Sequence, residues 1–390
     1  MFNLYIKNSN VLQGTQFIKT DILVEDGKIF GIGNFKDTAD IKTKTINGEG
    51  CYLIPGLIDI HTHGGNGIDI IACSEQELNE LTLFYASQGV TSFLPTVGTV
   101  SKDKTYNALK KIKMLMQKGT KGSQILGVHM EGPYISEEYR GAQNLEDIKN
   151  PDIKEFQKFE EISNYNIKLV TIAPEKQGAI KLIEYLTSQG IATSIGHSGA
   201  DYETCIEAID KGVTSVTHFL NGMKEFHQHR PSIIGAALEK DIYCEMICDG
   251  KHLHPGTVRM LLKTKGPARL IMITDSIMAA GLGDGTYDGF IKVIVKDNDA
   301  KLESGMRAGS VLTAINAIRN VIKFTGMELK EVIPMMTENP AKLLNIYDKK
   351  GSIERGKDAD MVMLNKSLDV MATICKGEIA YTNKEYEQKT

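Results

Sequence analysis

The chain has 390 residues, of which 42% are hydrophobic and 24% charged, and its formal net charge is −4. This balance is ordinary for a soluble globular protein and gives no electrostatic reason to expect nucleic acid or an anionic membrane as a partner. No apolar run approaches the roughly 18–20 residues of a membrane helix, and the N-terminus lacks the pattern of a signal peptide. None of the six cysteines forms a CxxC pair. We therefore expect a soluble cytoplasmic protein with free thiols.

The two ends of the chain share one pattern. Residues 1–54 contain short apolar runs separated by turns, with Asp26-Gly27 as a hairpin signal. Residues 347–390 have the same short runs broken by glycine and aspartate, and neither end contains a histidine. We expect these two segments to pair into a small β-sandwich domain, with residues 55–346 forming a larger domain between them.

Helical and strand patterns alternate in the central part. Ser74 and Glu77 have the spacing of a capping box, which predicts a helix that ends near Ser87. Further amphipathic helices are expected at 102–118, 176–189, 200–211, 257–265 and 312–324. Short apolar strands are expected at 57–60, 90–95, 125–130, 167–173, 191–196, 213–218, 242–248 and 269–274. Such an alternation indicates a parallel sheet buried on both faces. Eight units predict an α/β fold of the (β/α)₈ TIM-barrel type.

Polar side chains follow six of these eight strands. In a (β/α)₈ barrel the active site lies at the C-terminal ends of the strands. The side chains at those ends are His61, His63, His129, Glu131, His197, His218, Asp249, His252 and Asp275. Each one alone has a simpler interpretation, as a packed histidine or as a helix cap. Their coincidence at one end of the barrel predicts a metal or catalytic centre.

The donor types narrow the chemistry. Nitrogen and carboxylate ligands without cysteine suit Zn²⁺, Fe²⁺, Co²⁺ or Mn²⁺. Such an ion activates water, and a neighbouring carboxylate can take the proton of that water. Asp275 is the candidate for this base, so the residues predict metal-assisted hydrolysis. His227, His229 and His254 fall outside the strand-end pattern, and we expect them at the surface or behind the site.

Several motifs together resemble one family. PGLIDIHTHG, HMEGPYIS, GHSGA, THFLNGM, DGKH and TDSIMAAGL occur in this order, and they resemble the N-acetylglucosamine-6-phosphate deacetylases of the amidohydrolase superfamily. The resemblance covers essentially the whole chain. It implies hydrolysis of the acetamide of N-acetylglucosamine 6-phosphate to glucosamine 6-phosphate and acetate, in amino-sugar catabolism or recycling. It also implies a homodimer.

The resemblance implies roles for individual residues. Glu131, His197 and His218 would hold the main divalent ion, for which zinc is the first choice and iron, cobalt or manganese are alternatives. His61 and His63 match a pair that helps to bind a second ion in many relatives. The acid/base that serves both the attacking water and the departing amine would be Asp275. The sugar phosphate would contact Ala142, Gln143, Asn221, Gly222 and His252.

Two departures from the family pattern concern the phosphate. Where the family has an Arg-Glu-Pro-Gly stretch, whose arginine reaches the phosphate across a dimer interface, this chain has His229-Arg230-Pro231-Ser232. An apolar family position before Ala308 and Gly309, which also line the site, is Arg307 here. His229, Arg230 and Arg307 are therefore the candidate phosphate partners.

Two other functions remain open at this point. One is deacetylation of a related substrate, such as N-acetylgalactosamine 6-phosphate or a non-phosphorylated N-acetyl amine. The other is a catalytically inactive barrel that binds a partner. The presence of Glu131, His197, His218 and Asp275 argues against the second.

Overall fold

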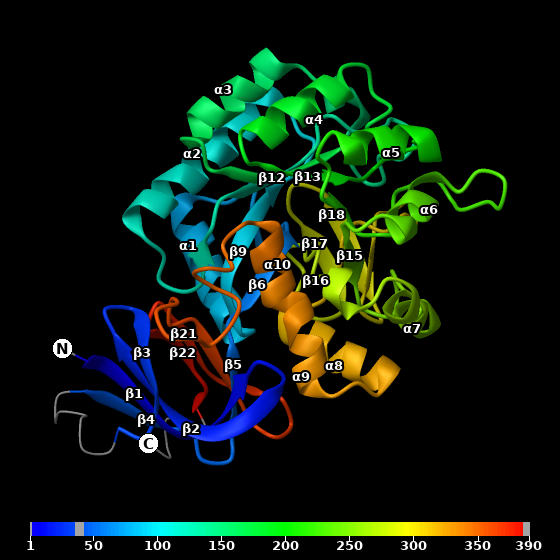
Figure 1. The fold of residues 1–390 in the computed structure, drawn as a ribbon. Helices are drawn as coiled ribbons and strands as arrows, with labels where there is room; N and C mark the ends of the chain where they lie inside the picture. The colour runs from blue at the N-terminus through cyan, green and yellow to red at the C-terminus, as the bar shows by residue number, and fades with distance from the viewer. Residues whose placement is uncertain (1, 36–42, 385–390) are drawn as a thin grey trace.

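Strands from both ends of the chain form one sheet, here called the terminal sheet. The computed structural model describes residues 2–35 and 43–384. The terminal sheet contains β1 (Phe2–Gln13), β2 (Gln16–Glu25), β3 (Lys28–Gly33), β4 (Lys44–Asn47), β5 (Tyr52–Pro55), β20 (Met361–Leu364), β21 (Val370–Cys375) and β22 (Glu378–Thr382). Its order is β22-β21-β20-β5-β1-β2-β3, with β4 beside β1. The blue and red strands therefore lie side by side (Figure 1).

Apolar side chains from both ends of the chain share the core of the terminal sheet. Ile6 of β1, Leu53 of β5 and Met361 of β20 are buried in one cluster. The pairing of β5 with β20 is antiparallel, with Ile54 opposite Val362. The two termini do form a small β domain together, as predicted, and its strands are hydrogen-bonded into one sheet. The division into domains at residues 54/55 and 346/347 stays a prediction.

The central part forms a nearly closed parallel barrel. Its strands are β6 (Leu57–Thr62), β9 (Val90–Val97), β10 (Gln124–Ile125), β11 (Val128–Glu131), β12 (Ile167–Ile172), β13 (Ala192–Ile195), β14 (Ser215–Val216), β15 (Tyr243–Ile247) and β16 (Leu270–Ile273). The two short strands β10 and β11 both pair with β9, so they act as two pieces of one barrel strand. A parallel bridge between Thr62 and Ser276 brings the first and last strands together. The predicted α/β barrel fold is confirmed.

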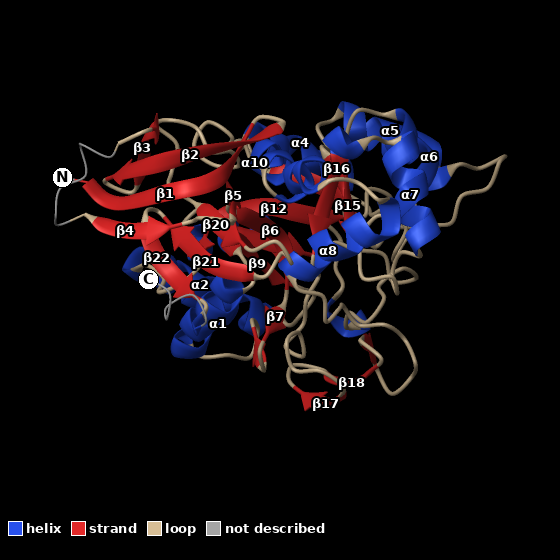
Figure 2. Ribbon diagram, turned by 90° about the horizontal axis from the view of Figure 1, so that it is seen from below, coloured by secondary structure: helices blue, strands red, loops and turns tan. Residues whose placement is uncertain are grey.

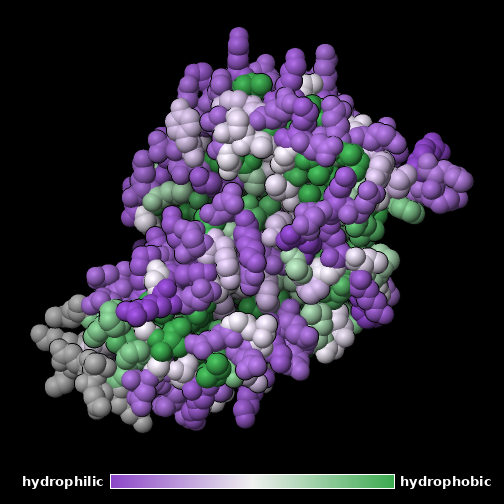
Figure 3. All heavy atoms as spheres, viewed as in Figure 1, coloured by the Kyte–Doolittle hydropathy of each residue, from purple (hydrophilic) through white to green (hydrophobic). Residues whose placement is uncertain are grey.

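Helices cover the outside of the barrel (Figure 1). They are α1 (Glu75–Ser87), α2 (Lys102–Lys118), α3 (Ile153–Ser163), α4 (Ala179–Ser188), α5 (Tyr202–Asp210), α6 (Ser232–Glu239), α7 (Pro255–Thr264) and α8 (Ala314–Thr325), followed by α9 (Leu329–Val332) and α10 (Glu338–Leu343). Single 3₁₀ turns lie at η1 (Leu145–Asp147), η2 (Pro267–Arg269) and η3 (Ile333–Met336). The capping box at Ser74 is present as predicted. Hydrophilic residues cover most of the outer helical surface in the space-filling view (Figure 3). No helix within the described ranges is long and apolar enough to span a membrane.

A small antiparallel sheet, here called the flap sheet, was not predicted. It consists of β17 (Gly285–Asp288), β18 (Lys292–Lys296) and β19 (Asp299–Lys301), and it stands apart from the barrel strands (Figure 2). Val293 and Val295 of β18 pack with Met278 in a separate apolar cluster. A short hairpin, β7 (Gly64–Gly65) with β8 (Ile68–Asp69), follows the first barrel strand. The flap sheet brings residues of the segment after β16 over the mouth of the barrel, where they line a cavity.

Candidate active site

A cavity of about 940 Å³ opens at the C-terminal ends of the barrel strands. It is bounded by the strand ends on one side and by residues of the flap sheet on the other. Its walls include most of the predicted site residues, namely His63, Glu131, Ala142, Gln143, His197, His218, Asn221, Gly222, His252, Asp275, Arg307, Ala308 and Gly309. His61 lies behind this wall and is fully buried. His229 and Arg230 are exposed and lie outside the cavity wall.

One group of metal-type donors centres on Glu131, at the end of β11. Its Oε1 lies 3.1 Å from Nε2 of His197 and 3.1 Å from Nε2 of His218. The two Nε2 atoms are themselves 3.1 Å apart. On the other side of each ring, Nδ1 of His197 donates to the carbonyl of Tyr139 at 2.8 Å, and Nδ1 of His218 donates to that of Asn221 at 3.1 Å.

These contacts define which nitrogen of each ring is free. A carbonyl oxygen only accepts hydrogen bonds, so each Nδ1 carries a hydrogen, and each neutral ring then presents the lone pair of its Nε2. Two lone pairs and a carboxylate oxygen therefore converge on one buried point. Backbone carbonyls behind ligating histidines are typical of metal sites. The residues therefore fit a divalent cation bound between Glu131, His197 and His218.

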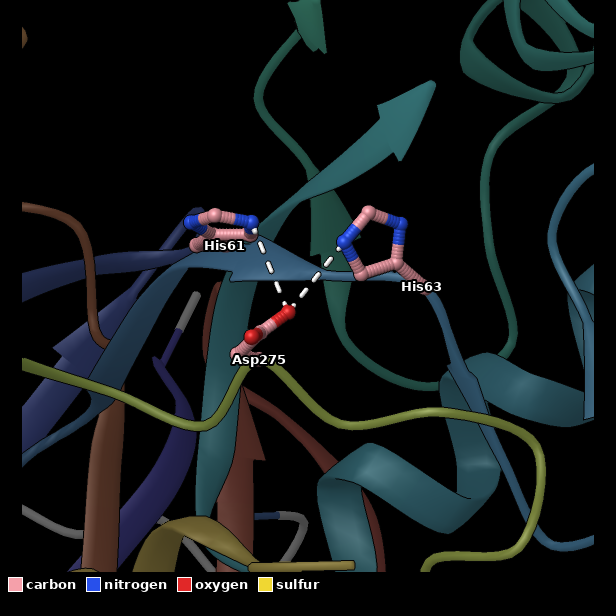
Figure 4. Close-up of side chains that lie close together, drawn as sticks. All are labelled: His61, His63 and Asp275. Atoms are coloured by element: carbon pink, nitrogen blue, oxygen red, sulfur yellow. Dashed lines mark ion pairs between the residues drawn. The ribbon is translucent and has the colours of Figure 1, made fainter. Parts of the chain in front are cut away.

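A second group contains His61, His63 and Asp275 (Figure 4). Nε2 of His61 lies 3.5 Å from Oδ1 of Asp275, and Nε2 of His63 lies 3.2 Å from the same oxygen. Both rings come from the end of β6 and point toward Asp275, which follows β16. Glu131 joins the two groups, because its Oε1 lies 3.3 Å from His61 Nε2 and its Oε2 lies 3.4 Å from His63 Nε2.

Charge interactions and hydrogen bonds in the centre shift the pKa values of its residues against the effect of burial. Burial alone would lower the pKa of His63, but hydrogen bonds and charge interactions with Asp275 and Glu131 outweigh it and raise the pKa to about 9. Burial would raise the pKa of Glu131, but the charge of His61 and the histidine hydrogen bonds hold it well below its usual range. The pKa of Asp275 is also lowered, because His61 and His63 outweigh its burial. The centre therefore favours the ionised form of both carboxylates, and their negative charges attract a positive charge to the space between them.

Three of the central residues have strained backbones. His197, His218 and Asp275 all have positive φ angles, of 47°, 30° and 48°. Residues other than glycine rarely adopt this conformation, which costs of order 1–3 kcal/mol each and clusters at functional sites. Gly222 also has a positive φ, and a Cβ there would lie 3.1 Å from Nδ1 of His197. The close approach explains why glycine occupies that position.

Comparison with known proteins agrees with this geometry. The sequence model of the amidohydrolase family matches residues 52–380. A relative from Bacillus subtilis, an N-acetylglucosamine-6-phosphate deacetylase, is 36% identical over 99% of this chain and 99% of its own. The chain belongs to the amidohydrolase family.

Solved structures of amidohydrolases extend the likeness to three dimensions. The N-acetylglucosamine-6-phosphate deacetylase of Thermotoga maritima is 34% identical with a TM-score of 0.87, covering 97% of this chain and all of that one (100%). A mutant deacetylase of Mycobacterium smegmatis, solved in complex with N-acetyl-D-glucosamine-6-phosphate, is 27% identical with a TM-score of 0.89. The match covers 97% of this chain and 99% of the mutant deacetylase. The amidohydrolase family is metal-dependent, and the two candidate donor groups fit that property.

Two cations, one at the end of the flap sheet and one in the turn after it, line the cavity. Nε of Arg307 lies 2.8 Å from Oδ1 of Asp299, and its Nη2 donates to Oδ2 at 3.1 Å. Nζ of Lys301 lies 3.0 Å from the same carboxylate. Both cations line the cavity, and together with Asp299 they leave one net positive charge there. Lys301 is not among the predicted site residues, because the flap sheet that carries it was not predicted.

The predicted phosphate partners therefore separate in space. Arg307 lines the cavity, whereas His229 and Arg230 belong to an exposed loop before α6. This loop projects away from the body of the chain (Figure 1). His227 is also exposed, and His254 caps α7 by accepting from the backbone of Gly256, as expected for histidines outside the strand-end pattern.

His129 differs from the other strand-end histidines. Its Nδ1 lies 3.2 Å from the hydroxyl of Thr96 and its Nε2 2.8 Å from that of Thr171, so both nitrogens have partners inside the barrel. Its ring packs edge-on against His61, with centroids 4.6 Å apart. Burial holds its pKa well below the usual range. His129 is therefore a neutral packing residue behind the centre and does not face the cavity.

Proposed function

We propose that this chain is a metal-dependent deacetylase that hydrolyses the acetamide of N-acetylglucosamine 6-phosphate to glucosamine 6-phosphate and acetate. The proposal rests mainly on the two donor groups, which meet at Glu131. Both groups place side chains in the wall of one cavity, including the candidate base Asp275. Close similarity to deacetylases over the whole chain supports the same reaction.

Glu131, His197 and His218 would hold one divalent ion, and His61 and His63 would hold a second. Zinc is our first choice, because a mixed histidine and carboxylate set suits it, and iron, cobalt or manganese would also fit. A divalent ion bound there supplies Lewis acidity, which activates water and polarises the acetamide carbonyl.

The residues of the chain move the protons and orient the sugar. The lowered pKa of Asp275 keeps its carboxylate ionised at neutral pH, ready to accept the proton of the attacking water. The same carboxylic acid then donates that proton to the departing nitrogen. Gln143, whose side-chain oxygen accepts from Thr99 N at 2.5 Å, presents its Nε2 beside His197 at 3.3 Å. Asn221, Gly222, Ala142, Ala308 and Gly309 would line the sugar phosphate.

Within one chain, Arg307 is our candidate for the phosphate partner, assisted by Lys301. The shared carboxylate of Asp299 holds both cations at the cavity wall. Arginine suits a phosphate because its planar guanidinium donates two parallel hydrogen bonds. We also propose a homodimer, in which the loop with His229 and Arg230 would serve if it reached the cavity of the other copy.

We also propose that the enzyme acts in the cytoplasm. Among the described residues no disulfide joins two cysteines, which fits a reducing compartment.

Acetate release from a panel of three substrates tests the function. We expect the highest kcat/KM for N-acetylglucosamine 6-phosphate, with lower values for N-acetylgalactosamine 6-phosphate and for N-acetylglucosamine without phosphate. Chelation should abolish the activity and added Zn²⁺ should restore it. Equal values with and without the phosphate would refute phosphate recognition, and activity that survives complete metal removal would refute the metal-dependent reaction.

A further inference from the structure

Glu245 is a buried carboxylate behind the candidate metal centre. It lies on β15, its side chain is fully buried, and it does not line the cavity. Its Oε2 lies 3.1 Å from Nδ1 of His61 and accepts the backbone N–H of His218 at 3.1 Å. One oxygen thus contacts a residue from each of the two donor groups.

The cost of burying the Glu245 carboxylate must be offset by its contacts. Burial of an ionised group is costly unless hydrogen bonds or opposite charges offset it. The second oxygen of Glu245, Oε1, has no hydrogen-bond partner within the described residues. The contacts of Oε2 to His61 and His218 are therefore what hold this charge inside the barrel.

The contact determines how His61 faces the centre. An ionised carboxylate only accepts, so Nδ1 of His61 is the donor and its ring is held with Nε2 on the opposite side. That Nε2 is buried, has no well-aligned hydrogen-bond partner in the described part of the chain, and points toward Glu131 and Asp275. A carboxylate behind a histidine whose other nitrogen is unpartnered is the arrangement that orients metal ligands.

The second contact of Glu245 is with the backbone of His218, which belongs to the Glu131 group. His218 has a positive φ of 30°, which a residue with a side chain rarely adopts. The hydrogen bond from its N–H to Glu245 helps to hold this strained conformation. The same glutamate thereby ties the position of His218 to that of His61.

We propose that Glu245 is a positioning residue that presents Nε2 of His61 to a second divalent ion and ties that ion's site to the Glu131 group. The inference rests on the metal centre of the proposed function. Glu245 does not touch the cavity, so it would act on the second ion through His61, and its bond to the His218 backbone would fix the position of the Glu131 group.

Zn²⁺ binding to the metal-free protein tests the proposal without an activity measurement. We expect wild type to bind two Zn²⁺ per chain in competition with a chelating dye. Glu245→Leu should keep the first and bind the second about 10–100-fold more weakly, the usual effect of losing such a partner. Glu245→Gln, which retains an accepting oxygen, should recover most of the loss. Unchanged affinity for both ions in Glu245→Leu would overturn the proposal.

Two controls separate positioning from general loosening of the barrel. Glu160 is another buried glutamate, on α3, where it accepts from the hydroxyl of Tyr185 at 2.6 Å. Glu160→Leu should leave both Zn²⁺ affinities unchanged. In a His61→Ala background, Glu245→Leu should weaken the second Zn²⁺ no further. A further loss there would mean that Glu245 acts on the second ion otherwise than through His61, against the proposal.

A measurement on wild type covers the case in which Glu245→Leu does not fold. In protein with ¹⁵N-labelled histidine and bound Zn²⁺, NMR should find the His61 proton on Nδ1 and the metal at Nε2. Metal at Nδ1 would overturn the proposal. A wild type that releases acetate but binds one Zn²⁺ would overturn this inference alone. Two bound ions without acetate release would support the site and count against the proposed function.

Discussion

His252 and Asp249 form a close pair at the edge of the cavity, with Nδ1 of His252 2.6 Å from Oδ2 of Asp249. Burial alone would lower the pKa of His252, but the hydrogen bond and charge of Asp249 outweigh it and raise the pKa above its usual value. The imidazole therefore keeps its proton to a higher pH than an ordinary histidine does. With Nδ1 bound to Asp249, the protonated ring offers its Nε2–H to a substrate oxygen.

This pair predicts a pH dependence of substrate binding. Because the folded pKa of His252 is raised, its charge is complete below its ordinary value of 6.5 and is lost as pH rises through the raised value. KM for N-acetylglucosamine 6-phosphate should rise over that range. Asp249→Asn can still accept the N–H groups of Lys251 and His252, so the rise should begin at lower pH. Identical KM profiles in variant and wild type would contradict the role of the pair.

Asp275→Asn should remove the proton acceptor while leaving the Glu131 group intact. We expect kcat to fall by about 10²–10⁴-fold, the usual contribution of a general base or acid. The Zn²⁺ bound by Glu131, His197 and His218 should remain, as elemental analysis of the purified variant would show. Wild-type turnover in this variant would rule out the acid/base assignment.

Arg307→Leu tests the phosphate partner within the chain. Loss of a charged hydrogen bond of about 1.5–3 kcal/mol should lower kcat/KM for the 6-phosphate by about 10–100-fold. The value for N-acetylglucosamine should stay the same, because that sugar has no phosphate to contact. Lys292→Leu is the matched control, since Lys292 is a cation of the flap sheet that pairs with Glu303 outside the cavity. An unchanged preference in Arg307→Leu would point to His229 or Arg230 from another copy.

Lys350→Met should destabilise the fold. Lys350 is buried, contacts Asp358 at 3.0 Å, and forms a closer ion pair with buried Asp360. Its removal leaves a buried carboxylate without its cation, which typically costs about 3–5 kcal/mol. Urea unfolding of the metal-loaded protein would measure the loss.

The control for that experiment is an exposed pair. Lys342 contacts Glu338 on the surface of α10, and exposed pairs contribute about 0–1 kcal/mol. Lys342→Met should therefore unfold close to wild type. Equal losses in the two lysine variants would show that the burial of Lys350 is not what makes it important.

Local patterns in the sequence predict most of the barrel. Apolar runs between helical segments locate each barrel strand to within a few residues, and the strand ends indicate which side chains meet. The flap sheet was missed although β18 alternates regularly, with Val293 and Val295 buried between exposed neighbours. Its alternation is short, and its partners in the apolar cluster include Met278, which lies before it in the chain.

The contact between Glu245 and His61 inside the barrel could not be predicted, for a different reason. Glu245 and His61 are 184 positions apart, and their contact depends on the register of two strands that do not pair with each other. A glutamate within the apolar run of β15 was the available signal, but the run does not indicate which residue it meets. The location of Arg307 likewise depends on how the flap sheet folds back over the barrel.

The shared terminal sheet has a consequence for how the protein emerges from the ribosome. Lys28 pairs with Asp358 at 2.9 Å across 330 positions of chain. Strands β1–β3 are made before the barrel and β20–β22 after it, so the apolar faces of β1–β3 stay uncovered while the barrel is synthesised. Pairing over such a distance is intrinsically slow and exposes unpaired edges to aggregation. Chaperone demand during translation should therefore be greatest for the first strands of this chain and should end when β20 arrives.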